Sequence, residues 1–156
     1  MADHIFILSP TSWIGEGKIQ LNMFHEELNF LTRWDANNKD SGGSIECIQE
    51  IQIKGLSDIM NNQFSIFNLT PNGFEIELEN MALGKIAGKG IITSKLIAWE
   101  FRVPHLGFEG FEFYEKQKDE SYLMRAEYST TDQYRTLITG KIWQHKKDKE
   151  KDKDKE

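Results

Sequence analysis

Two stretches of the sequence contain residue types that support phosphate or metal chemistry. Residues 84–90 read Gly-Lys-Ile-Ala-Gly-Lys-Gly, but the glycine spacing is one residue short of a phosphate-binding loop. The Ser or Thr that would hold magnesium is also missing, and no crossover helix is predicted to follow. His25-Glu26-Glu27-Leu28 contains the first half of a zinc-binding helix, but no second histidine stands at the fifth position. Neither stretch predicts a complete site.

Cys47 is the only cysteine and therefore the only candidate thiol nucleophile. Along residues 44–54 its phase matches that of Ile45, Ile51 and Ile53. A small residue buried in the core is therefore the favoured interpretation.

Pairs of carboxylates occur throughout the chain, including Glu75 with Glu77, Glu109 with Glu112, and Glu112 with Glu115. Residues two apart share one face of a strand, whereas residues three apart do not. Solvated surface charge explains these pairs better than general acid–base catalysis.

Glu100 and Arg102 share one face of a predicted strand. If that face meets solvent, they form an ion pair worth 0 to about 1 kcal/mol. With the opposite alternation they would be interior polar anchors for the head group of a ligand. A barrel enzyme with Tyr128, Glu100 and Arg102 pointing inward is the corresponding alternative, although the sequence favours a protein without catalytic activity.

Length and charge limit the classes of function. A chain of 156 residues forms one ordinary domain with a substantial core. Its formal net charge of −6 argues against a nucleic-acid partner, which would require a basic stripe. No stretch approaches the length of a membrane-spanning helix, so no membrane insertion is expected. A single cysteine and the lack of a secretory signal in residues 1–10 predict a cytoplasmic protein.

The elements that must position any site are strands. In residues 95–103, Ile97, Trp99, Phe101 and Val103 alternate with smaller or polar residues, which is the two-residue period of a strand. The preceding strand, residues 84–92, contains three glycines, which indicate a bend or a close backbone approach.

A β-hairpin is predicted where residues 64–70 and 74–79 flank Pro71-Asn72-Gly73, because Asn-Gly between alternating runs is a strong hairpin signal. Two local irregularities are also expected. Residues 57–62 are predicted to form one helical turn capped by Ser57. A bulge at Gly110 would bring Phe108 into phase with Phe111 and Phe113.

The chain as a whole contains about ten such segments, with turns spaced as in a sandwich or barrel. Short connections favour pairing of sequential neighbours, and closure removes the exposed sheet edges. The sequence therefore predicts an all-β protein, an antiparallel up-and-down barrel of eight to ten strands, with a β-sandwich as the alternative. Residues 1–12 are expected to form a leader, residues 13–144 the barrel, and residues 145–156 a charged, disordered tail.

The opening Trp13-Ile14-Gly15-Glu16-Gly17 resembles the start of the first strand in calycin-superfamily barrels. It is more similar to the Trp-x-Gly-x-Gly of nitrobindin-like and fatty-acid-binding-protein-like domains than to lipocalins, because Ser12 stands where lipocalins have glycine. The resemblance implies that Trp13 closes one end of the barrel, that Arg135 packs over it, and that a small hydrophobic or amphipathic ligand binds inside.

The interior of such a barrel is either filled by its own side chains or holds one small ligand. The large residues on the predicted apolar faces would supply the lining of a ligand site: Trp34, Trp99, Phe101, Phe111, Phe113, Met124 and Tyr128. Two functions follow from the two interiors. The first is binding of a small hydrophobic molecule, and the second is a protein-interaction or structural module with a filled core. The sequence does not determine the oligomeric state.

Haem is a further implication of the nitrobindin resemblance, because that family holds it through a histidine near the C-terminal end. This chain has His4, His25, His105 and His145, and neither of the last two lies in a segment that matches the family's ligand strand. For His105 and His145, an exposed position on the surface is the favoured interpretation. No cofactor and no metal is therefore expected.

Overall fold

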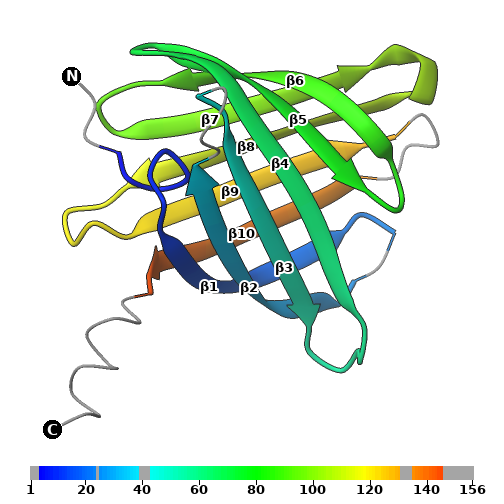
Figure 1. Ribbon diagram of the computed structural model, residues 1–156. Helices are drawn as coiled ribbons and strands as arrows, with labels where there is room; N and C mark the ends of the chain where they lie inside the picture. The colour runs from blue at the N-terminus through cyan, green and yellow to red at the C-terminus, as the bar shows by residue number, and fades with distance from the viewer. Residues whose placement is uncertain (1–3, 24, 39–42, 131–134, 146–156) are drawn as a thin grey trace, which may run out of the picture.

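Ten strands and one short 3-10 turn make up the computed structural model, which describes residues 4–23, 25–38, 43–130 and 135–145 (Figure 1). The elements are β1 (Ser12–Leu21), β2 (Glu27–Asn38), β3 (Ile45–Ile53), β4 (Ile59–Thr70), β5 (Gly73–Asn80), β6 (Gly84–Ile92), β7 (Leu96–Val103), η1 (Pro104–Leu106), β8 (Phe108–Lys116), β9 (Tyr122–Ser129) and β10 (Arg135–Gln144).

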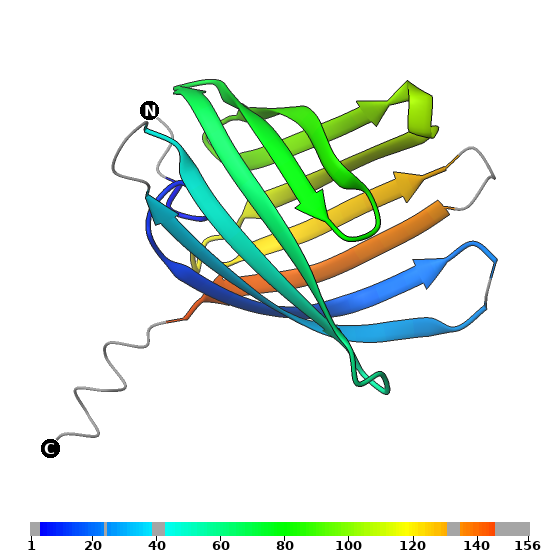
Figure 2. The same ribbon diagram turned by 45° about the vertical axis from the view of Figure 1, so that its right-hand side comes forward.

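Every strand pairs antiparallel with its neighbour in the sequence, and β1 also pairs with β10. The sheet is therefore a closed ten-strand antiparallel barrel (Figures 1 and 2). This confirms the predicted up-and-down barrel and excludes the sandwich alternative. The predicted tail lies almost entirely outside the described residues.

Alternation along each strand separates the interior from the outer surface. In β5, Phe74, Ile76 and Leu78 are buried, while Glu75 and Glu79 between and beyond them are exposed. The predicted hairpin is confirmed, because β4 and β5 pair across a turn at Pro71 and Asn72. Burial of one apolar face against the barrel interior is the main stabilising contribution of each strand.

Gly90 shows why the glycines of β6 are needed. A Cβ atom at Gly90 would lie 2.1 Å from Cζ of Phe74 on the neighbouring strand. The Phe74 ring thus occupies the space of a side chain, which is the close approach that the sequence predicted.

Two local predictions are wrong. Residues 57–62 do not form a helical turn, because β4 begins at Ile59 and its first residues pair with the end of β3. Hydrogen bonds to β3 therefore stabilise this segment in place of the predicted helix cap. Gly110 forms no bulge either, since β8 pairs in unbroken register with both β7 and β9.

The segment before β1 folds into one end of the barrel, at the left of Figure 1. Phe6 and Ile7 are completely or almost completely buried in the core cluster that also contains Trp13. His4 bonds the hydroxyl of Tyr122 through Nδ1 at 2.6 Å and the carbonyl of Thr93 through Nε2 at 2.7 Å. This end is therefore closed by Trp13 together with residues that precede the barrel.

Arg135 does not pack over Trp13. It begins β10, whereas Trp13 pairs with Gln144 at the other end of that strand. Its exposed guanidinium instead forms an ion pair with Glu127, with 3.2 Å between Nε and Oε1. The strand direction of β10 excludes the contact that the resemblance implied.

Candidate functional site

A cavity of about 440 Å³ occupies the half of the barrel opposite the closed end. Its walls are mostly apolar and come from nearly all strands. The lining residues at its rim lie at strand ends, including Leu21, Leu28, Ile53, Met60 and Phe108. The cavity therefore meets the end of the barrel at which the β1–β2, β3–β4 and β7–β8 connections lie.

The other half of the barrel is filled by its own aromatic side chains. Trp99 stacks on Tyr114 with 5.0 Å between ring centroids, and Trp34 stacks on Phe64 at 5.1 Å. Phe6 packs against Tyr114 from the closed end at 4.7 Å. The barrel therefore combines both of the interiors that the sequence allowed. The half at the closed end is filled with side chains, which form the floor of the cavity, and the other half contains the cavity.

The structure separates the seven predicted site residues into three groups. Met124 and Tyr128 line the cavity. Trp34, Trp99 and Phe101 are buried in the core but are not among the lining residues. Phe111 and Phe113 lie on the outer face of β8, where their rings contact each other and Phe113 is 39% exposed.

The prediction that Phe111 and Phe113 face the interior is therefore wrong. Because β8 has no bulge, its inner face consists of Phe108, Gly110, Glu112 and Tyr114. The spacing of three glutamates in the sequence indicated this. Glu109 and Glu115 fall on the same face of a strand, whereas Glu112 falls on the opposite face.

Glu112 is the functional residue that sequence reasoning missed. Its side chain is only 4% exposed and lines the cavity. Trp99, directly opposite on β7, donates from Nε1 to Oε2 at 3.3 Å. The hydroxyl of Tyr114 donates to Oε1 at 2.6 Å, and the hydroxyl of Tyr128 donates to Oε2. Three neutral donors from three strands thus converge on one buried carboxyl group.

Gly110 makes the contact between Tyr128 and Glu112 possible. A Cβ atom at Gly110 would lie 2.2 Å from Cδ1 of Tyr128, so the absence of a side chain leaves room for the ring. Phe108 stacks on the same ring with 5.7 Å between centroids. Packing against Phe108 and Gly110 therefore orients the Tyr128 hydroxyl.

Burial raises the pKa of the Glu112 carboxyl above its ordinary value, although the three hydrogen bonds act in the opposite direction. Burial and the neighbouring carboxyl also raise the pKa of Tyr114 and Tyr128 well above that of an ordinary phenol. Both phenols are therefore neutral donors near neutral pH.

We expect Glu112 to make the stability of the fold fall with rising pH. Because its pKa is higher in the folded than in the unfolded chain, the folded state holds a proton that the unfolded state has lost between the two values. The free energy of unfolding relative to that of Glu112→Gln should be largest below the unfolded pKa. It should then fall by up to about 1.4 kcal/mol per pH unit until the folded pKa is passed.

Urea denaturation followed by tryptophan fluorescence across the acidic and neutral range measures this difference. Glu109→Gln is the matched control, because Glu109 lies on the exposed face of the same strand. Parallel pH profiles for the wild type and Glu112→Gln would contradict the expectation.

A row of amides lies on the opposite wall, on β3, β4 and β5. Asn80 Nδ2 donates to Asn62 Oδ1 at 3.0 Å, and Asn62 Nδ2 donates to Gln49 Oε1 at 3.0 Å. Gln49 Nε2 then donates to Thr32 Oγ1 at 3.2 Å. All three amides line the cavity.

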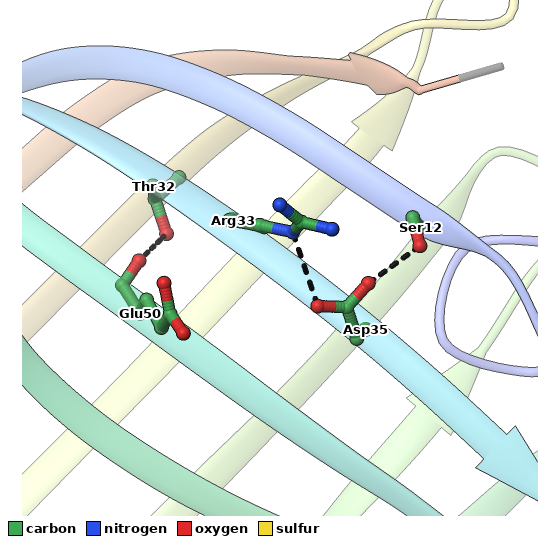
Figure 3. Close-up of polar contacts among 5 residues, drawn as sticks. All are labelled: Ser12, Thr32, Arg33, Asp35 and Glu50. Atoms are coloured by element: carbon green, nitrogen blue, oxygen red, sulfur yellow. Dashed lines mark hydrogen bonds and ion pairs between the residues drawn. The ribbon is translucent and has the colours of Figure 1, made fainter. Parts of the chain in front are cut away.

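Both ends of this row are anchored to the backbone. The Leu83 amide donates to Asn80 Oδ1. The Thr32 hydroxyl donates to the carbonyl of Glu50 (Figure 3). These anchors permit only one orientation of each amide along the row. Each amide nitrogen consequently keeps a second N–H, so this wall offers hydrogen-bond donors. Gln49 was recognisable as the polar member of an otherwise apolar strand face, whereas Asn62 and Asn80 gave no signal.

The other candidate groups of the sequence lie away from the cavity. Glu100 and Arg102 form an exposed ion pair at 3.5 Å, which confirms the surface interpretation. Cys47 is buried as predicted, and burial raises the pKa of its thiol to about 12. None of the four histidines lines the cavity, so its walls do not fit a haem iron. Among the described residues, no group of His, Cys, Asp and Glu is placed to hold a metal ion.

In the parts of the chain that the structure describes, no helix has the length and apolar character needed to cross a membrane.

Comparison with known proteins gives a structural relative but no family. The sequence matches no protein-family model and no curated protein. The S-type phycobiliprotein lyase CPES from Guillardia theta has a similar structure, with a TM-score of 0.68, 10% sequence identity and 94% of each chain covered. At this identity the similarity shows a shared fold.

Proposed function

We propose that this protein binds a small hydrophobic or amphipathic molecule in the cavity of its barrel. The observation that carries the proposal is the cavity itself, whose 440 Å³ lies within the range of about 300 to 1,000 Å³ that ligand pockets occupy. Apolar walls with a few oriented polar groups are also typical of such pockets. Glu112 and the amide row are those groups here.

The structural relative supports the same proposal. A phycobiliprotein lyase is built on a barrel of this form, so the fold can serve a protein that acts on another molecule. The closed end formed around Trp13 supports membership of the calycin superfamily. The single, buried thiol supports a reducing compartment such as the cytoplasm.

Binding of a neutral fluorescent probe, N-phenyl-1-naphthylamine, tests the proposal. We expect saturable binding to the wild type and at least about tenfold weaker binding to Ile51→Trp, because an indole at this lining position fills part of the cavity. Fluorescence titration measures both affinities. Native mass spectrometry of freshly purified protein shows in addition whether a ligand is carried through purification.

Ile48→Trp is the matched control. Ile48 lies on the same strand but is 43% exposed on the outer face, so the added indole meets solvent. Equal affinities in the two variants, or no binding to the wild type, would refute binding of this class of ligand in the cavity.

A further inference from the structure

Glu112 is an acidic group without a basic partner. Among the described residues that line the cavity it is the only acidic one, and none of them is Lys, Arg or His. In the same described part of the chain, no ion pair includes Glu112. A buried carboxylate is stable only when a cation or sufficient hydrogen bonds compensate its charge.

The hydrogen bonds around Glu112 show what kind of ligand group fits beside it. Trp99, Tyr114 and Tyr128 each have one side-chain hydrogen, and all three are already donated to this carboxyl. Oε2 accepts two of these bonds and Oε1 accepts only one. When the carboxyl is ionised, the site therefore has unused acceptor capacity at Oε1 and no unused donor. A ligand atom placed here must be a donor.

We propose that Glu112 binds a protonated nitrogen of the ligand, so that the cavity takes small apolar amines. The inference rests on the proposed function and specifies its ligand class. A cationic donor satisfies the free acceptor and also supplies the positive charge that the surrounding residues do not. A neutral hydroxyl group would donate a hydrogen bond to the free acceptor but would supply no positive charge.

Because the pKa of the Glu112 carboxyl is raised, binding of a cation beside it is coupled to release of a proton. Without a ligand, the carboxyl holds a proton at any pH below this raised pKa. An ammonium ion that enters from solution keeps all of its protons, and the carboxyl releases its own to the solvent as the ion pair forms. The titratable groups that face Glu112 are the phenols of Tyr114 and Tyr128, which stay protonated and do not contribute.

Two probes of nearly equal shape test the proposal: 1-naphthylmethylamine, which is cationic at neutral pH, and 1-naphthalenemethanol, which is neutral. Isothermal titration calorimetry in buffers of different ionisation enthalpy measures affinity and proton release together. We expect the wild type to bind the amine at least about tenfold more tightly than the alcohol. Across the acidic and neutral range, proton release per amine bound should approach one below the pKa of Glu112 and vanish above it, and no proton should be released per alcohol.

Glu112→Gln should remove both the preference for the amine and the proton release, while Glu109→Gln on the outer face of β8 should keep both. Proton release by the wild type is a readout that does not depend on the folding of any variant. Equal affinities for the two probes, or amine binding without proton release anywhere in this pH range, would overturn the assignment of the ligand class and leave the barrel as a ligand-binding protein. Failure of both probes to bind a wild type that still binds N-phenyl-1-naphthylamine would overturn the ligand class alone, and failure of all three would overturn both proposals.

Discussion

Phe6→Ala is expected to lower the free energy of unfolding by about 3–5 kcal/mol, even though Phe6 precedes the first strand. Its side chain is 0% exposed, and its ring centroid lies 4.7 to 5.5 Å from those of Trp13, Trp34, Tyr114 and Tyr122. Truncation would leave a large cavity at the closed end, where the rigid barrel wall limits collapse. Urea denaturation followed by tryptophan fluorescence measures the loss.

Ile5→Ala is the matched control. Ile5 is the preceding residue and is 38% exposed, so its truncation should cost less than about 1 kcal/mol. A similarly small loss for Phe6→Ala would mean that the segment before β1 is dispensable to the core, as expected for a separate leader. The predicted large loss would instead make residues 4–11 part of the barrel's closure.

Trp99→Ala is expected to cost a similar amount, about 3–5 kcal/mol, and to weaken ligand binding as well. The indole stacks on Tyr114 and lies within 6.4 Å of three further aromatic rings, so its loss opens the floor of the cavity. It also removes the Nε1 donor from Glu112. Urea denaturation and titration with N-phenyl-1-naphthylamine measure the two effects.

Trp99→Phe separates packing from hydrogen bonding, because it keeps an aromatic ring but has no N–H. It should cost less than Trp99→Ala and should still change the pH dependence that Glu112 produces. Trp143→Ala, on the exposed face of β10, should leave both stability and probe affinity nearly unchanged. If Trp99→Ala destabilises the fold without affecting the probe, the floor does not support the ligand site.

Much of the barrel could be predicted from alternation and turn chemistry alone. Local residue types were sufficient to predict three features: the Asn72-Gly73 hairpin, the glycine-rich strand β6 and the buried apolar face of β7. Residues 57–62 could not be predicted in this way, because their conformation depends on pairing with β3. Hydrogen bonds to a partner strand override the local preference for a helical turn.

The candidate site was harder to predict because β8 has aromatic residues on both of its faces. Phe111 and Phe113 are outward, and Phe108 and Tyr114 are inward, so hydrophobicity alone does not assign the interior. Only the unbroken register with β7 and β9 places Glu112 inside. Tyr128, predicted as part of an apolar lining, acts there through its hydroxyl as a partner of Glu112.

By itself, the amino-acid sequence determined an all-β chain of about ten short strands, because side-chain alternation and turn residues are local properties. The tertiary structure alone decided where the barrel is filled and where it is hollow. It also decided which carboxyl group is buried, since Glu112 receives its partners from β7, β8 and β9. These properties depend on contacts between strands, and a one-dimensional pattern does not contain the register that creates them.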